Sequence, residues 1–348
     1  MEYLLHHYFP NPENYKPIPV GDGHINDTYR LLNPNGKDYL LQRINHQVFP
    51  DVPSLMKNLV MITDFIKKQP HTYSSKVDHL TVLPTTDGRF YHQTKLGEYW
   101  RILNFFEHHT SHTIPDTNPA IAHQQIHTAA RAFGHFLYQL RDFPVHQLSI
   151  VLPDFHNVPV RLSQLKKAVS ANPKDRLSEI ANELAIIEKL KPQMCVIQQL
   201  ANQQKIPLRV THNDTKFNNV LFGKNGAAPV VIDLDTVMPG YVHYDYGDGL
   251  RTATVTTAED EKNLDHIQVD WERYKAFQKG YLSATSDLLQ PLEKSTLALA
   301  APTLAYLMAV RFFTDYLLGD LYYKTGYPQQ NLYRGRAQLR LTEQFLLI

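Results

Sequence analysis

The side chains with the clearest chemical potential gather in one segment, residues 206–237, which contains several short apolar runs. The polar and acidic groups that border those runs are His212, Asn213, Asp214, Asn219, Asp233 and Asp235. Apolar runs that end in polar clusters, with the turn sequence GKNG between them, are typical of short strands joined by a hairpin. The pattern therefore predicts two or three short strands that bring their polar ends near one another.

Phosphoryl transfer is a reaction that needs this set of groups. A hydroxyl nucleophile needs a carboxylate that orients it and accepts its proton, and Asp214 offers one. Metal ions that bridge phosphates take hard oxygen ligands, and Asn219 and Asp233 offer an amide and a carboxylate. Asn219 follows Asp214 by five residues, which is the spacing in the catalytic loop of protein kinases.

The segments THNDTKFNNVLF and VVIDLDTVMPGYVHYDYGD resemble the aminoglycoside phosphotransferase-type kinase superfamily, which also contains choline and homoserine kinases. The pattern of that superfamily is H-x-D-x-x-x-x-N followed by a hydrophobic strand that ends in I-D, and the matching residues are His212, Asp214, Asn219 and Asp233. Within the superfamily, the blocks GHINDTY, LLQRIN, HNDTK–NN, IDLDTVMPG and RFFTDYLLGDLYY are together similar to the bacterial N-acetylhexosamine 1-kinases. These blocks span residues 21–323, which is most of the chain.

The resemblance implies a role for each matching residue. Asp214 would be the catalytic base, and His212 would support the loop that carries it. Asn219 and Asp233 would be Mg²⁺ ligands, with Asp235 as a weaker candidate for a metal contact or a supporting contact. The implied cofactors are ATP and Mg²⁺.

A glycine-containing loop near the N-terminus is a candidate for covering the nucleotide phosphates. Gly21 and Gly23 permit backbone conformations that other residues avoid, and backbone N–H groups at a hairpin tip can bind phosphate oxygens. The loop departs from G-x-G-x-x-G because Asn26 stands at the third glycine position. The chain has no Walker A motif, which disfavours a P-loop fold. By resemblance, His24 and Asp27 would lie close to the sugar, and His24 is our substrate candidate.

The strand LLQRIN occupies the place of the kinase strand that normally carries a phosphate-binding lysine, yet it has no lysine. Arg43 is our predicted replacement, and Gln42 is the alternative, because strand alternation sends neighbouring side chains to opposite faces. The connector that would pair with adenine through its backbone falls near Phe105.

The late apolar helix offers candidates for the acceptor pocket. Arg311 lies within a long apolar run, and a charge in such a place needs a partner or a ligand. One interpretation is an ion pair with Asp315 at i, i+4. The other, suggested by the N-acetylhexosamine kinase resemblance, is that Arg311 binds sugar hydroxyls and that Tyr322 forms a wall of the pocket.

Two textures along the chain indicate how these residues are positioned. Residues 1–105 mix β-like runs such as 29–32 and 38–45 with turn residues, and they include one helical pattern over 52–68. The rest is mostly helical, with expected helix breaks at Pro192 and Pro302. We therefore predict an α+β, two-lobed protein-kinase-like fold, with a small β-rich N-terminal lobe (1–105) and a larger, mostly helical C-terminal lobe (106–348).

Composition narrows the function classes. The 348 residues carry a formal net charge of +1, which disfavours a dedicated nucleic-acid binder. The longest apolar stretch, residues 297–310, is too short for a typical membrane span, and the N-terminus has no signal-peptide pattern. A single cysteine rules out an intrachain disulfide. We expect a cytoplasmic enzyme, monomeric or homodimeric, that acts on a small-molecule sugar or alcohol.

The sequence thus favours ATP-dependent phosphorylation of a hydroxyl, and the resemblance favours the anomeric hydroxyl of an N-acetylhexosamine. A kinase for another alcohol, such as choline, homoserine or an aminoglycoside, is the alternative within the class. A non-catalytic nucleotide-binding pseudokinase is the alternative outside it. The missing lysine and the altered glycine loop favour the pseudokinase, whereas the intact Asp214, Asn219 and Asp233 oppose it.

Overall fold

The computed structural model describes residues 1–20, 25–69 and 79–347. The chain divides into two compact units. Unit 1 contains Met1–His112, Gln139–Leu152 and Asn218–Pro239, and unit 2 contains Thr113–Tyr138, Pro153–Phe217 and Gly240–Ile348. This division into compact units does not test where one lobe ends and the next begins. The lobe boundary near residue 105 therefore stays a prediction.

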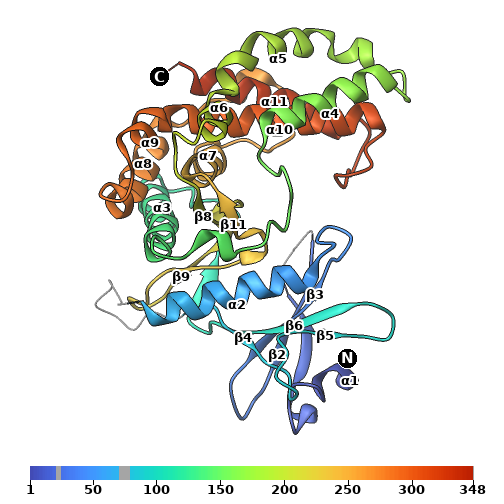
Figure 1. The fold of residues 1–348 in the computed structure, drawn as a ribbon, viewed down its shortest axis with the longest axis vertical. Coiled ribbons are helices and arrows are strands. Elements are labelled where there is room, and N and C mark those ends of the chain that lie inside the picture. The colour runs from blue at the N-terminus through green and yellow to red at the C-terminus, as the bar shows by residue number, and fades with distance from the viewer. Residues whose placement is uncertain (21–24, 70–78, 348) are drawn as a thin grey trace. The chain divides into compact units, whose positions relative to one another are not determined.

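Unit 1 is built on an antiparallel sheet of six strands (Figure 1). The strands are β1 (Lys16–Pro19), β2 (Asp27–Leu32), β3 (Tyr39–Ile44), β4 (Val82–Leu83), β5 (His92–Gln93) and β6 (Tyr99–Asn104). Their order is β1-β2-β3-β6-β4, and β5 also pairs with β6. The predicted hairpin is confirmed because β2 and β3 pair antiparallel around the turn at 33–38. In this register Gln42 of β3 lies opposite Arg101 of β6.

One long helix and one short helix accompany this sheet. Helix α2 (Val52–Lys68) matches the predicted range, and its N-terminus is capped by the Asp51 side chain, which accepts a hydrogen bond from the Ser54 amide at 3.1 Å. Its buried residues recur every three or four positions, as at Leu55, Leu59 and Ile62, because only one face of the helix is covered. Helix α1 (Glu2–Leu5) contributes Leu4 and Leu5 to an apolar cluster with the sheet residues Leu31, Leu41 and Ile102.

A second, smaller sheet completes unit 1. Its strands, in the order β10-β9-β7, are β7 (His109–Ser111), β9 (Val220–Gly223) and β10 (Val230–Val231). The β9–β10 hairpin lies within the segment where the sequence predicts short strands. Among the described residues, the remaining regular structure in and at the edge of this unit is one strand and four 3₁₀ turns. These are β11 (Met238–Gly240), η1 (Pro12–Asn14), η2 (Val145–Gln147), η4 (Phe217–Asn219) and η5 (Leu234–Thr236).

Unit 2 is mostly helical. Its helices are α3 (Pro119–Gln139, all but its last residue), α4 (Val158–Ala171), α5 (Ala181–Met194), α6 (Val196–Asn202), α7 (Val242–Ala253), α8 (Trp271–Thr285), α9 (Pro291–Thr296), α10 (Ala300–Leu318) and α11 (Gln330–Phe345). The short elements are strand β8 (Arg209–Thr211) and the 3₁₀ turns η3 (Leu177–Ile180), η6 (Leu264–His266) and η7 (Leu297–Leu299).

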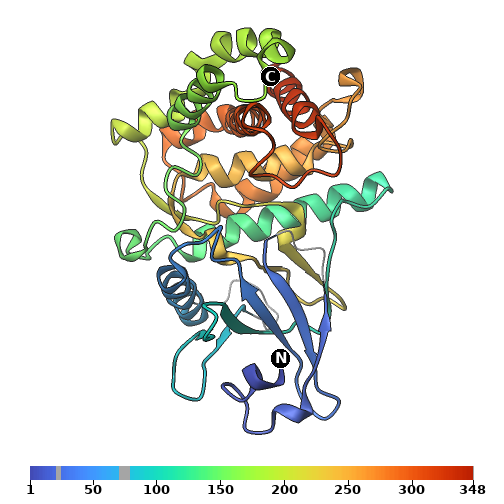
Figure 2. The same ribbon diagram turned by 90° about the vertical axis from the view of Figure 1, so that its right-hand side faces the viewer.

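Helix α10 is the centre of unit 2, where it packs with α4, α5 and α11 (Figure 2). Pro302 falls in its first turn, where proline is tolerated, so the predicted break takes the form of the 3₁₀ turn just before the helix. Pro192 lies inside the last turn of α5, which ends two residues later at Met194. The span Pro291–Leu318 is long and apolar enough to cross a membrane. However, 72% of its most apolar 18-residue stretch is buried inside the protein, which is typical of a core helix.

Candidate functional site

The loop after β8 in unit 2 carries the predicted base, and Asp245 of α7 holds that loop. The amide of His212 donates to Oδ2 of Asp245 at 2.9 Å, and the amide of Asn213 donates to Oδ1 at 2.7 Å. The hydroxyl of Thr215 donates to the backbone carbonyl of Asp245 at 2.6 Å. One acidic residue from a buried helix therefore binds the backbone before Asp214 and the side chain that follows it.

Burial dominates the electrostatics of Asp245. Its side chain lies in the interior, and this desolvation raises its pKa to about 6, although the electrostatic influence of His212 and the hydrogen bonds from the amides of His212 and Asn213 pull the pKa down. Above pH 6 the group is a carboxylate and can accept both amide hydrogen bonds. Sequence reasoning assigned no role to Asp245, because its partners lie more than thirty residues earlier in the chain.

His212 is placed where it can support the loop. Its Nδ1 accepts a hydrogen bond from the Asp214 amide at 3.2 Å. Its ring makes edge contacts with Phe133 and Phe136, with centroids 5.5 and 5.9 Å away. The imidazole is fully buried, so it fits the supporting role predicted from the motif rather than direct contact with a substrate.

Asp214 itself is accessible. Its side chain is 18% exposed, and Nζ of Lys216 lies 2.8 Å from its Oδ1. Lys216 is 46% exposed and brings a positive charge beside the predicted base. Lys216 was not among the residues predicted from the sequence, although it lies within the catalytic motif.

His156 links the catalytic loop to a cluster of aromatic side chains. Burial lowers its pKa to about 4, so the imidazole is neutral at physiological pH and its Nε2 donates to the Asn213 carbonyl at 3.0 Å. Its ring packs against Phe155, with the centroids 4.5 Å apart. Arg311 packs on the same phenylalanine, with its guanidinium carbon 5.2 Å from the Phe155 ring centroid. The predicted base and the predicted acceptor residue are thus joined through contacts inside unit 2.

Arg311 packs on aromatic rings and does not pair with Asp315. Besides Phe155, its guanidinium carbon lies 5.7 Å from the ring centroid of Tyr322 and 5.5 Å from that of Tyr323. Asp315 accepts backbone hydrogen bonds from residues 321, 322 and 323 at 2.9, 2.8 and 3.0 Å. Asp315 therefore holds the loop that presents Tyr322, and the described residues contain no ion pair between Arg311 and Asp315.

A second arginine lies close to Arg311. Arg161 of α4 donates to the Phe155 carbonyl at 3.1 Å and to Gln164 at 2.9 Å. Burial is the main cause that lowers its pKa, and the positive charge of Arg311 lowers it further. Throughout the described part of the chain, neither arginine forms an ion pair, so two guanidinium groups lie beside aromatic faces without a close ionic partner; Asp154 acts on Arg161 only at longer range.

The two predicted metal ligands lie on neighbouring backbone segments of unit 1. The amide of Ile232 donates to the Asn219 carbonyl at 3.0 Å, which places Asn219 next to the strand end that carries Asp233. Asp233 has left-handed backbone angles, with φ 59° and ψ 57°. An amide oxygen and a carboxylate oxygen are hard donors, so the pair fits Mg²⁺. The described residues include no group of three or more histidine, cysteine or acidic side chains suited to a metal, and Asn219 and Asp233 as Mg²⁺ ligands stay a prediction.

The structure separates the roles of Gln42 and Arg43. Arg43 is 45% exposed and pairs with Asp27 and Glu98, with Nη1 2.8 Å from the Glu98 carboxylate. Gln42, on the other face of β3, donates to the Thr28 hydroxyl at 3.1 Å and accepts from Arg101. Phosphate binding by Arg43 stays a prediction, and it would have to compete with both of these carboxylates. Asp27, which the resemblance placed near the sugar, is one of them.

The remaining nucleotide candidates are only partly described. Phe105 follows β6 at the start of the predicted connector, and the guanidinium carbon of Arg30 lies 4.3 Å from its ring centroid. Gly21, Gly23 and His24 lie outside the described residues.

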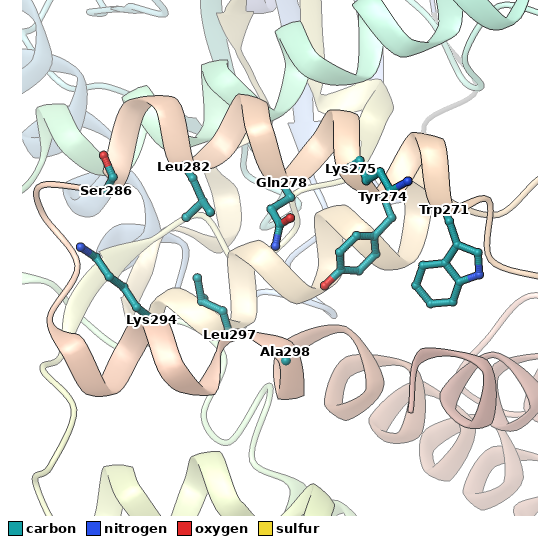
Figure 3. Close-up of a pocket in the computed structure, with 9 residues that line it drawn as sticks. All are labelled: Trp271, Tyr274, Lys275, Gln278, Leu282, Ser286, Lys294, Leu297 and Ala298. Atoms are coloured by element: carbon teal, nitrogen blue, oxygen red, sulfur yellow. The ribbon is translucent and has the colours of Figure 1, made fainter. Parts of the chain in front are cut away.

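Unit 2 also has a groove of about 510 Å³ between α8 and the η7 region (Figure 3). It is lined mainly by apolar and aromatic side chains, including Trp271, Tyr274 and Leu297, with Lys275 and Lys294 at its edge. None of the residues predicted for catalysis or binding lines this groove. The candidate site therefore rests on the chemistry around Asp214 and Arg311.

Comparison with known proteins agrees with this chemistry. Residues 16–277 match the phosphotransferase enzyme family. The chain is also similar in fold to a microcompartment-associated aminopropanol kinase, at 14% identity with a TM-score of 0.65 over 99% of this chain and 96% of that one. An aminoglycoside phosphotransferase from Alicyclobacillus acidocaldarius matches at 13% identity, with a TM-score of 0.63 over 100% of this chain and 94% of that one. A choline kinase from Cryptosporidium parvum matches at 14% identity, with a TM-score of 0.61 over 99% and 95%.

These similarities define the class of protein. The fold is a mixed α+β kinase-like fold, with a β-sheet N-terminal region and a helical C-terminal region, so the predicted fold class is confirmed. Because the family match covers well over half of the sequence, the chain belongs to the phosphotransferase enzyme family.

Proposed function

We propose that this protein is an ATP- and Mg²⁺-dependent small-molecule kinase that phosphorylates the anomeric hydroxyl of an N-acetylhexosamine. The observation that carries the proposal is the clamp of Asp245 on the backbone of His212 and Asn213, which presents Asp214 as an accessible carboxylate. A rigidly held carboxylate is what a kinase needs in order to align an acceptor hydroxyl.

In the proposed reaction Asp214 orients the acceptor hydroxyl and takes its proton as the oxygen bonds to the γ-phosphorus, while the bond from that phosphorus to the β–γ bridging oxygen breaks and ADP leaves. Lys216, next to Asp214, limits the build-up of negative charge as the phosphoryl group approaches. Asn219 and Asp233 would hold Mg²⁺, which supplies charge neutralisation on the phosphates when it is bound. Little covalent chemistry is required of the protein, because alignment and electrostatics supply most of the rate enhancement.

The side chains around Arg311, in the predicted acceptor pocket, favour a polyhydroxylated acceptor over a cationic one. The aromatic faces of Phe155, Tyr322 and Tyr323 could form a cage for a quaternary ammonium group, but Arg311 already packs against them. Arg161 adds a second positive charge nearby. A cationic acceptor such as choline or an aminoglycoside would be repelled, whereas sugar hydroxyls and an N-acetyl carbonyl can accept hydrogen bonds from guanidinium groups.

A panel of acceptors tests this proposal. ADP release would be measured with N-acetylglucosamine, N-acetylgalactosamine, choline, homoserine and kanamycin under identical Mg·ATP concentrations. We expect release with at least one N-acetylhexosamine, together with a product that is acid-labile because its phosphate is on the anomeric carbon. Release with choline or kanamycin alone would overturn the sugar assignment. Tight Mg·ATP binding without release for any acceptor would favour a pseudokinase.

A further inference from the structure

A buried ion pair in unit 1 is unexplained by the roles assigned so far. Arg101 of β6 and Asp235 of η5 form a two-pronged pair, with Nη1–Oδ1 at 2.5 Å and Nη2–Oδ2 at 3.0 Å. Their side chains are only 2% and 3% exposed. Burying two charges is costly unless the geometry is good and the remaining hydrogen-bonding groups are satisfied.

The remaining groups of this pair are satisfied by two amide side chains. Oε1 of Gln42 accepts from Nε and Nη2 of Arg101 at 3.0 and 2.8 Å. Nδ2 of Asn26 donates to Oδ2 of Asp235 at 2.8 Å. Asn26 is itself held, because its Oδ1 accepts from the Asn45 amide at 3.0 Å. We call Asn26, Gln42, Arg101 and Asp235 the Arg101 network.

The network shows which residue supplies the buried positive charge of this sheet. Gln42 stands on the inward face of the strand where a lysine was expected, and Arg101 lies directly opposite it on the next strand. A cross-strand partner points to the same face of the sheet. The positive charge on this face is therefore supplied by β6 instead of β3, and it is committed to Asp235.

The network also binds the turn that begins at Asp233. Asp235 follows Asp233 by two residues, within the 3₁₀ turn that Asp233 begins. On the other side of this turn, Nδ2 of the buried Asn58 donates to the Val237 carbonyl at 3.1 Å. Asp233 has the left-handed backbone angles that non-glycine residues rarely adopt, so its conformation persists only where the surroundings hold it. Arg101, Asn26 and Asn58 are side chains that bind this turn.

We propose that Arg101 is a positioning residue for the divalent metal, acting through Asp235 to fix the turn that presents Asp233. It also neutralises the second carboxylate of the turn, which leaves Asp233 as the acidic ligand. This inference rests on the proposed role of Asp233 as a Mg²⁺ ligand. The functional consequence is that loss of the two-pronged pair weakens the Mg²⁺-dependent part of nucleotide binding.

The test uses the full chain and the fluorescent nucleotide methylanthraniloyl-ATP, titrated with and without MgCl₂, so no acceptor is needed. The variant Arg101→Lys keeps the charge but loses the planar fork. The double variant Arg101→Met/Asp235→Leu removes both charges together, which avoids leaving an unpaired buried carboxylate. The matched control is Arg209→Lys, because Arg209 forms a similar buried pair with Glu293 in unit 2, at 2.8 and 2.7 Å, and has no role in the proposed site.

We expect both Arg101 variants to lose about tenfold or more in Mg²⁺-supported affinity, as is typical when a group that orients a metal ligand is removed. Their affinity for the nucleotide in metal-free buffer should match that of the wild type. Arg209→Lys should lower the melting temperature without changing either affinity. Folded Arg101 variants with wild-type Mg²⁺-supported affinity, or with equal losses in both buffers, would overturn the inference alone. If the wild-type protein binds the nucleotide with the same affinity with and without MgCl₂, the proposed function would be overturned as well.

Discussion

Oδ1 of Asp245 accepts a hydrogen bond at 2.7 Å from the amide of Asn213, the residue immediately before the predicted base. The other carboxylate oxygen takes the neighbouring amide of His212 at 2.9 Å. Asp245 belongs to α7, in which almost every residue is buried. The accessible carboxylate of Asp214 is thus anchored to one of the most deeply buried helices of unit 2.

The first prediction concerns this anchor. Asp245→Asn keeps the shape but replaces one acceptor oxygen with an amide group that cannot accept, so one of the two loop amides loses its partner. We expect kcat to fall roughly 100-fold, because small misplacements of a catalytic group are that costly. The KM for ATP should change little. Steady-state kinetics would measure both values, and an unchanged kcat would contradict the anchoring role.

The second prediction concerns the pH dependence of stability. Burial lowers the pKa of folded His156 to about 4, below the ordinary value of ~6.5 in the unfolded chain. Between these values the unfolded chain binds a proton that the folded chain does not, so the stability contributed by neutral His156 is present above pH ~6.5 and is lost as pH falls toward 4.

The variant His156→Gln removes this titration and leaves the other groups in place. The difference in unfolding free energy between wild type and variant should therefore shrink by roughly 2 kcal/mol between pH 7 and pH 5. Urea unfolding at the two pH values measures it. A difference that stays constant would show that His156 does not titrate as its burial implies.

The third prediction concerns acceptor binding. Arg311→Met keeps an unbranched apolar stem but removes the guanidinium that faces Tyr322 and Phe155. We expect the KM for the sugar to rise by about tenfold or more while the KM for ATP stays constant, since charged hydrogen bonds are worth about 1.5–3 kcal/mol.

The control for this experiment is Arg336→Met, which removes a half-buried arginine whose partner is Glu183, outside the aromatic cluster. It should leave both KM values unchanged. Equal effects of the two substitutions on the sugar KM would remove Arg311 from the acceptor site.

The fourth prediction concerns the packing of α3 against α8. A Cβ atom at Gly280 would lie 2.2 Å from the backbone carbonyl oxygen of His127, which cannot move without shifting the helix. Gly280→Ala should therefore destabilise the protein by about 1–3 kcal/mol, the usual cost of overpacking. Gly326→Ala is the control, because its nearest neighbour would be 3.8 Å away at the flexible end of Gln330. Thermal unfolding of both variants decides the matter, and equal midpoints would contradict this view of the helix crossing.

Local patterns predicted much of the fold. The turn residues around Gly36 predicted the β2–β3 hairpin, and the spacing of apolar residues predicted α2 to its exact ends at Val52 and Lys68. Proline positions were informative to within a turn, and Pro192 lies in the last turn of α5. Proline is disfavoured in the helix interior and accepted in the first turn. That is why Pro302 lies just inside α10 instead of breaking it.

Long-range partners were not predictable in this way. Asp245, His156 and Arg101 act on residues 32, 57 and 134 positions away, and a single sequence contains no signal for such pairings. Strand alternation placed Gln42 and Arg43 on opposite faces but could not decide which faced inward. In the structure Gln42 faces Arg101, and Arg43 lies on the opposite face, where it pairs with Asp27 and Glu98 at an exposed position.

The central claim is that Asp214 is the base of a phosphoryl transfer, and the variant Asp214→Asn tests it most directly. The measurement is formation of phosphorylated sugar from Mg·ATP, followed by phosphorus NMR, beside the affinity of the same variant for methylanthraniloyl-ATP. We predict that product formation is lost while nucleotide affinity and the melting temperature stay at wild-type values. Phosphorylated sugar formed by Asp214→Asn at the wild-type rate would contradict the account.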